Sequence, residues 1–111
     1  MKTKQFEIWL ADLNPTCGTE PGKIRPVAIV QTDLLNEQHP SVIICPITTN
    51  INPGAEILRV HLKNAQLSKP SDILVDQLRV IDNRRLVKKI GKLTKEQIAK
   101  LKENIMIVLD L

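Results

Sequence analysis

Short apolar stretches, separated by prolines, glycines and polar residues, occupy most of the first ninety positions of the chain. Alternating or continuous apolar runs bounded by such turn residues are typical of β-strands. The pattern predicts strands over residues 6–13, 26–33, 42–47, 57–62, 73–80 and 87–90. The second strand is apolar at four consecutive positions, 27–30, which predicts burial on both faces. Pro46 within the third strand predicts an edge strand or a bulge.

The last segment of the chain has helical periodicity. Thr94 is a good N-cap, and Gln97 three residues later completes a capping box. Apolar residues then recur at helical spacing, at Ile98, Leu101, Ile105 and Val108 or Leu109. Strands first and one helix last, without alternation of the two, predict a mainly β fold: a small antiparallel β barrel or sheet with a C-terminal helix. The helix should pack on the sheet, and it could also serve a dimer.

Composition is ordinary for a globular protein and predicts a single domain, residues 1–111. The N-terminus lacks a long apolar run, and no segment reaches the length of a membrane span. These features predict a cytoplasmic protein without a membrane partner. Two cysteines, Cys17 and Cys45, are too few for a disulfide framework.

Charge is distributed unevenly along the chain, although the net charge is only +4. Nine of the sixteen Lys and Arg residues lie between positions 79 and 102, where there are only two acids. Such a basic segment suits a polyanionic partner or an acidic protein tail, and a solvated face is the alternative. Aromatic residues are limited to Phe6 and Trp9. If the protein binds RNA, it should therefore do so through phosphate and polar contacts, with little base stacking.

A loop rich in turn residues, positions 18–26, leads directly into the apolar second strand. It carries Glu20 and Arg25, neither of which can enter a core unpaired, because an isolated buried ion is very unfavourable. Both side chains should therefore lie at the mouth of the strand, as residues of a site often do. An ordinary surface ion pair is the alternative.

Asp76 is predicted to lie in an extended strand, on the same side as Leu74 and Leu78. A carboxylate on an apolar face needs a partner, usually an arginine or backbone N–H groups. The candidate arginines are Arg25, Arg79, Arg84 and Arg85. Asp76 could form a buried ion pair that orders the structure, or it could orient an arginine of a site.

Other candidate chemistry is sparse. Thr48 and Thr49 end the third strand, where hydroxyls can donate to a phosphate oxygen or cap a turn. The two cysteines and two histidines lack the spacing of a metal site, and no glycine-rich phosphate loop is present, so we expect neither metal nor cofactor. A catalytic histidine pair would need His39 and His61 together, and each is expected to be a surface or partly buried residue.

Three separated blocks of the chain match one family in order and spacing. The blocks are GTEPGKIRPVAIV at 18–30, PITT at 46–49 and SDILVDQLR at 71–79. Together they resemble the MazF/PemK toxins of bacterial toxin–antitoxin systems, over essentially the whole chain. The resemblance implies an SH3-like antiparallel β barrel with a C-terminal helix and a homodimer. It also implies a metal-independent endoribonuclease that cleaves single-stranded mRNA at a specific sequence, and an antitoxin that blocks the RNA groove.

The resemblance also implies the site residues. The expected catalytic residues are Arg25, Thr48 and Glu20, and the expected substrate-binding residues are Thr49, Asp76, Gln77 and Arg79. The implied reaction is attack of an RNA 2′-hydroxyl on its own phosphate, which leaves a cyclic phosphate and a 5′-hydroxyl. Arg25 would bind the phosphate, and Glu20 is the more natural proton acceptor because a guanidinium hardly deprotonates. Some members carry a histidine in the first loop, where this chain has Thr16 and Cys17.

Two other functions fit the same fold. CcdB-like gyrase inhibitors use a C-terminal end that contains tryptophan, whereas the only tryptophan here is Trp9. A non-catalytic SH3-like RNA-binding module would not require the set of Glu20, Arg25 and Thr48. Both remain alternatives to the endoribonuclease.

Overall fold

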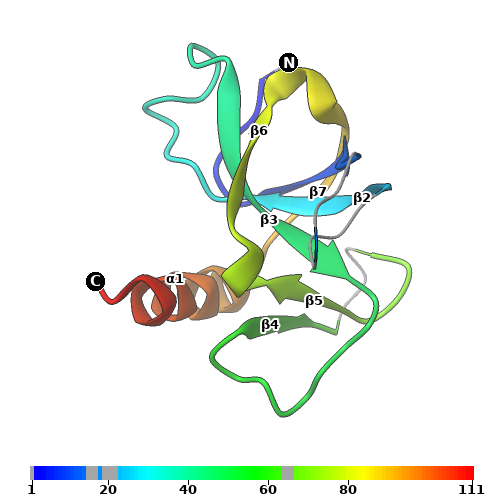
Figure 1. Cartoon of the computed structure of the whole chain (residues 1–111), viewed down its shortest axis with the longest axis vertical. Coiled ribbons are helices and arrows are strands. Elements are labelled where there is room, and N and C mark those ends of the chain that lie inside the picture. Colours follow the sequence, from blue (N-terminus) through cyan, green and yellow to red (C-terminus); the bar gives the residue numbers. More distant parts are fainter. Residues whose placement is uncertain (1, 15–17, 19–22, 64–66) are drawn as a thin grey trace.

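The computed structural model describes residues 2–14, 18, 23–63 and 67–111. The elements in chain order are β1 (Glu7–Asp12), β2 (Ile24–Ile29), β3 (Ser41–Thr48), β4 (Arg59–Leu62), β5 (Ser71–Leu74), the 3₁₀ turn η1 (Val75–Gln77), β6 (Arg79–Asp82), the 3₁₀ turn η2 (Asn83–Arg85), β7 (Leu86–Lys92) and α1 (Lys95–Leu109). The predicted class, mainly β with a C-terminal helix, is confirmed (Figure 1).

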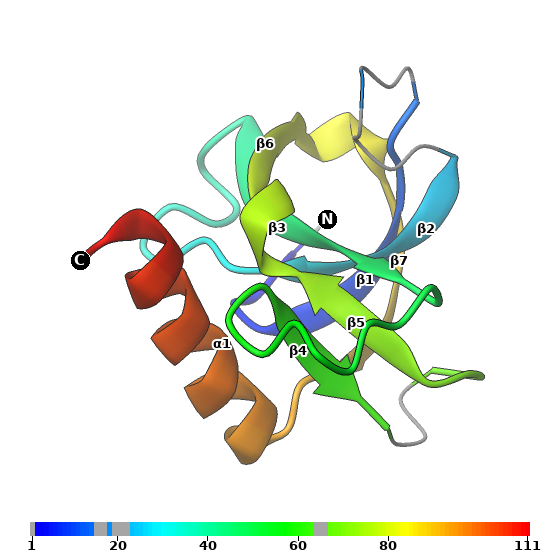
Figure 2. The same cartoon turned by 60° about the horizontal axis from the view of Figure 1, so that its bottom comes forward.

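The strands form one curved antiparallel sheet in the order β4-β5-β3-β2-β1-β7, and β6 pairs with the first half of β3. Figure 2 shows the sheet bending round on itself, with α1 beside β4. Among the described residues no ladder joins β4 to β7, so the predicted barrel is not closed by hydrogen bonds. The C-terminal end of β3 and the segment that follows it line an open pocket.

Side chains on the two faces of the sheet belong to two separate apolar clusters. Neighbouring residues of β2 divide between them: Val27 and Ile29 enter one, and Ala28 enters the other. All three are fully buried, which confirms the predicted burial of this strand on both faces. The cluster that includes Ala28 is covered by α1, whose Leu101 is fully buried.

The capping box predicted for α1 is present. Gln97 N–H donates to Thr94 Oγ1 at 3.2 Å, and Thr94 N–H donates to Gln97 Oε1 at 2.9 Å. The apolar stripe packs on the sheet as expected. Sequence analysis did not anticipate Asn104, which is fully buried and donates from Nδ2 to the carbonyls of Glu56 and Arg59 at 3.0 and 3.1 Å. The helix thereby fixes the segment that enters β4.

The predicted strand over 73–80 is interrupted by η1, so it forms two strands, β5 and β6. Both pair with the same side of β3, but the register of β6 is offset by three residues from that of β5. The three residues of η1 take up this offset. The prediction that Asp76 lies on the apolar face of an extended strand is therefore wrong: Asp76 is in η1 and is exposed.

Pro46 lies in a central strand, not at the predicted edge or bulge. On one side of β3 the pairing with β6 ends at Ile44, and the pairing with β5 begins at Ile47. Pro46 occupies the interval where β3 changes partner, which is where a missing backbone N–H disturbs the sheet least.

Candidate active site

One row of residues crosses four strands at the open end of β3. The register of β2 on β3, continued two residues past its last bridge, places Arg25 opposite Thr48. Thr48 also pairs with Asp72 of β5, and Asp72 pairs with His61 of β4. Directly opposite residues on antiparallel strands project from the same face. Arg25, Thr48, Asp72 and His61 therefore share one face of the sheet.

Arg25 and Thr48 line an open pocket with a volume of about 320 Å³. The other polar residues that line it are Asn50, Asn52, Arg59, Asp76 and Gln77. The turn η1 brings Asp76 and Gln77 to the pocket, so four of the seven predicted site residues lie together. Thr48 Oγ1 accepts the N–H of Asn50 at 3.1 Å, which fixes the start of the 50–58 segment at the pocket rim.

Three predicted site residues do not line this pocket in the described structure. Thr49 follows Thr48 on the opposite face and lines a separate hollow beside Pro26. Arg79 lies half-buried in β6, where its Nη1 is buried without a partner among the described residues. Glu20 lies outside the described residues, as does Cys17.

Hydrogen bonds join the two ends of the loop that carries Glu20. Leu13 N–H donates to the Lys23 carbonyl at 2.9 Å, and Lys23 N–H donates to Asn14 Oδ1 at 2.8 Å. Arg85 Nη1 donates to the carbonyls of Asp12 and Asn14, at the first of these two loop ends. The loop therefore leaves from and returns to a fixed point next to β2, two residues from Arg25.

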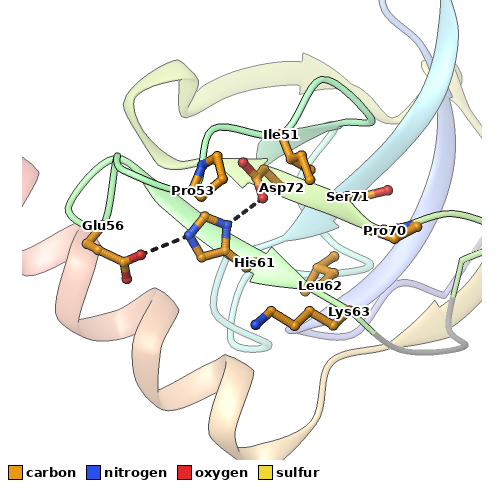
Figure 3. A pocket seen from close by; sticks show the side chains of 9 residues that line it. All are labelled: Ile51, Pro53, Glu56, His61, Leu62, Lys63, Pro70, Ser71 and Asp72. Carbon is orange, nitrogen blue, oxygen red and sulfur yellow. Dashed lines mark hydrogen bonds and ion pairs between the residues drawn. The ribbon is translucent and has the colours of Figure 1, made fainter.

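The buried carboxylate of the site is Asp72, which sequence analysis missed. It is fully buried and accepts three hydrogen bonds. Asn52 N–H and Arg59 Nη1 donate to Oδ2 at 2.8 and 3.0 Å, and His61 Nδ1 lies 2.7 Å from Oδ1 (Figure 3). The sequence signal for Asp72 is its place directly before the apolar run 73–75, four residues before Asp76.

Hydrogen bonds within this cluster shift the pKa values of Asp72 and His61 in opposite directions. Burial of Asp72 would raise the pKa of its carboxyl, but the hydrogen bonds from Asn52 N–H and His61 and the bond from Arg59 lower it below its usual value. The hydrogen bond to Asp72 raises the pKa of His61 above its usual value against the opposing effect of burial, and Glu56, 3.1 Å from Nε2, adds to this rise. The arrangement therefore favours an ionised Asp72 and a protonated His61.

His61 and Asp72 line a second, largely apolar pocket of about 190 Å³ (Figure 3). Alternate residues of one segment line the two pockets. Asn50 and Asn52 face the pocket of Arg25, whereas Ile51 and Pro53 face the apolar one. Asp72 accepts a hydrogen bond from Asn52 N–H and thereby fixes this segment between the two pockets.

The remaining candidate residues lie elsewhere. His39 is near Ser41, and its backbone carbonyl accepts a hydrogen bond from Asn83 Nδ2 at 2.8 Å, so it is not paired with His61. Cys45 is buried in the core, where burial and the charge of Asp76 raise its thiol pKa to about 12. Among the described residues, no group of three or more His, Cys, Asp or Glu side chains is arranged to hold a metal ion. Within the same part of the chain, α1 is too short and too polar to cross a membrane.

Comparison with known families agrees with the three sequence blocks. The profile described as "PemK-like, MazF-like toxin of type II toxin-antitoxin system" matches residues 4–109. The chain is 37% identical over 110 residues to a protein of Staphylococcus saprophyticus named Endoribonuclease MazF, covering 97% of this chain and 92% of that protein. These matches confirm the predicted family and the prediction of an enzyme.

Solved structures show the same fold. The Mycobacterium tuberculosis toxin MazF-mt6 is 28% identical and superimposes with a TM-score of 0.79, covering 95% of this chain and 97% of the toxin. MazF from Deinococcus radiodurans is 20% identical and superimposes with a TM-score of 0.87, covering 100% and 99% of the two chains. The chain belongs to the PemK-like, MazF-like toxin family of type II toxin–antitoxin systems.

Proposed function

We propose that this toxin is an endoribonuclease that cleaves single-stranded mRNA at a specific short sequence, in the pocket of Arg25 and Thr48. The observation that carries the proposal is the cross-strand placement of these two residues on one open, polar pocket. The name of the 37% identical relative, Endoribonuclease MazF, supports the substrate class. The pocket has no aromatic lining residue among those described, so it suits phosphate and polar contacts better than stacking.

The proposed reaction needs no metal ion. The 2′-oxygen of the RNA bonds to the adjacent phosphorus and loses its proton, while the bond from phosphorus to the 5′-oxygen breaks and that oxygen gains a proton. The products are a cyclic phosphate and a 5′-hydroxyl. Arg25 supplies a planar donor fork to the phosphate, where negative charge develops. Intrinsic acidity favours Glu20, on the adjoining loop, over Arg25 as the proton acceptor.

The other pocket residues have supporting roles in this proposal. Thr48 Oγ1 already accepts a hydrogen bond from Asn50, so its own O–H is the group that donates to a phosphate oxygen. Asp76 and Gln77, at the pocket wall, have the acceptor and donor groups that read base edges. Thr49 and Arg79 lie outside the pocket and would contact RNA only beyond it.

We propose two protein partners, a cognate antitoxin and a second copy of the chain, acting in the cytoplasm. The family description, a toxin of a toxin–antitoxin system, supports the first, as does a MazE–MazF structure from Deinococcus radiodurans whose toxin fold this chain shares. Lysines exposed along β7, such as Lys88, suit an acidic antitoxin segment. Exposed apolar residues at the end of α1, Met106, Ile107 and Leu109, suit a dimer contact.

The structure weighs against a gyrase inhibitor of the CcdB type. Trp9 is only 5% exposed and donates from Nε1 to Glu7 Oε1 at 3.0 Å. It is a core residue of β1, far in sequence from the C-terminal end that such inhibitors use. An RNA cleavage experiment distinguishes the proposed endoribonuclease from a non-catalytic RNA-binding module.

Arg25→Ala tests the proposal, with Arg84→Ala as the matched control. Arg84 is exposed, pairs with Asp82 and does not line the pocket. We expect Arg25→Ala to lower the RNA cleavage rate by about 10²–10³-fold, as loss of a transition-state donor does, with an unchanged unfolding midpoint. Arg84→Ala should cleave at the wild-type rate. Wild-type cleavage by folded Arg25→Ala would refute the assignment, and RNA binding without cleavage by the wild type would favour the non-catalytic module.

A further inference from the structure

A second arginine faces the pocket that holds Arg25. From the geometry around Arg59 we infer that it binds a second RNA phosphate, adjoining the scissile one, and that buried Asp72 is its positioning residue. The inference rests on the proposed endoribonuclease function. It adds a substrate-binding residue on β4, which none of the three sequence blocks includes.

The contacts of Arg59 leave most of its guanidinium available. Nη1 donates both to the Asn50 carbonyl and to Asp72 Oδ2, each at 3.0 Å. In the described part of the chain, Nε and Nη2 have no protein partner, and neither is among the buried atoms that lack one. The side chain is 18% exposed. Three of its five N–H groups therefore remain for a ligand.

The position of Arg59 is fixed from several sides. Its backbone N–H donates to the Ala55 carbonyl at 3.0 Å, and its own carbonyl accepts from Asn104 of α1 at 3.1 Å. Its side chain is held by fully buried Asp72. A fork restrained in this way loses less conformational entropy on binding an anion than a freely moving side chain does.

Asp72 does not neutralise Arg59 fully, because it also serves other donors. His61 Nδ1 and Asn52 N–H share its two oxygens with the guanidinium. Among the described residues that line the pocket, the ionisable ones are two arginines and one acid, Asp76, which together carry a net positive charge. A polar, open pocket with this charge suits consecutive phosphates of one strand better than an apolar ligand.

Salt dependence of binding tests the inference, with Arg59→Gln compared with the wild type. The probe is an oligonucleotide that spans a mapped cut site and carries 2′-O-methyl groups, so that it binds without being cleaved. One fewer phosphate contact should reduce the slope of log Kd against log[KCl] by about 0.7, the value for single strands. Arg84→Gln, outside the pocket, should keep the wild-type slope. An unchanged slope for folded Arg59→Gln would overturn the inference.

A second measurement gives its main result on the wild-type protein. Neutral methylphosphonate linkages, placed one at a time in the same probe, remove single phosphate charges. For the wild type, we expect about tenfold weaker binding when the linkage beside the scissile one is neutral, and for Arg59→Gln little further loss. Full wild-type affinity with each neighbouring linkage neutral would refute the second phosphate site. Absence of RNA cleavage by the wild type would instead refute the proposed function.

Discussion

Two aspartates four residues apart, Asp72 and Asp76, have opposite environments in this toxin. Asp72 lies in β5, is fully buried and accepts three hydrogen bonds, from Asn52, Arg59 and His61. Asp76 lies in η1, is exposed and lines the candidate pocket. Strand periodicity predicted that Asp76 lies on the apolar face of an extended strand. The comparison shows that a short turn within an apolar run is enough to exchange the burial of two neighbouring acids.

The three-residue offset between β5 and β6 on β3 explains this exchange. Alternation continues through β5 and places Asp72 on the face of Thr48 and His61. The turn η1 then interrupts this alternation, so Asp76 lies in the turn and not in the sheet. One aspartate thus organises the wall of the site from inside, and the other is available to the substrate.

Substitution by alanine should lower stability at Asp72 and should lower catalytic activity, without loss of stability, at Asp76. Asp72→Ala leaves the donors of Arg59 and His61 without their carboxylate, and we expect a loss of about 2–3 kcal/mol in the free energy of unfolding, somewhat less than for a fully buried pair because both partners are partly exposed. Asp76→Ala should leave stability unchanged but lower kcat/KM for RNA about tenfold, equivalent to loss of about 1.4 kcal/mol of transition-state stabilisation. Denaturant unfolding and cleavage kinetics on both variants measure this contrast.

Asp82→Ala is the control for the stability measurement. Asp82 also pairs with an arginine, Arg84, but the pair is exposed at the start of η2, where Asp82 is the N-cap and accepts the Arg84 N–H. Its removal should lower the unfolding midpoint much less than removal of Asp72, because an exposed pair and the cap of one short turn contribute little. Equal losses for Asp72→Ala and Asp82→Ala would contradict the special role of the buried carboxylate.

A smaller effect concerns pH. The pKa of His61 is raised in the folded protein above its ordinary value of 6.5, mainly by the hydrogen bond to Asp72. A raised folded-state pKa contributes stability that is fully present below pH 6.5 and is lost as pH rises through the folded-state pKa. The free energy of unfolding should therefore decline above pH 6.5 in the wild type and decline less in His61→Gln.

His39→Gln provides the matched control, because His39 lies on an exposed loop and does not contact Asp72. It should retain the wild-type pH dependence of unfolding. A decline of equal size in His61→Gln and the wild type would show that the His61–Asp72 pair does not carry this dependence.

Local patterns in the sequence predicted much of this molecule. The capping box of α1, the doubly buried β2 and the family all follow from residues close together in the chain. Arg25 and Thr48 could be assigned through the family blocks, and they do share a pocket. Their meeting depends on the register of β2 on β3, which the sequence alone does not specify.

What could not be predicted depends on contacts between distant segments. The bonds of Asn104 to the carbonyls of residues 56 and 59 cross 45 or more positions, and no local pattern marks them. The carboxylate of Asp72 is recognised as buried only once β4 and β5 are paired and His61 is opposite it. Arg59 was overlooked for the same reason, since its role depends on Asp72 and Asn50.

The most direct test of the central claim is a map of the ends produced when the purified, antitoxin-free protein is incubated with a long RNA in excess EDTA. We predict cuts at a short recurring sequence, with cyclic phosphate and 5′-hydroxyl ends. No cleavage by the folded protein, or cleavage that appears only when a metal ion is restored, would contradict the account.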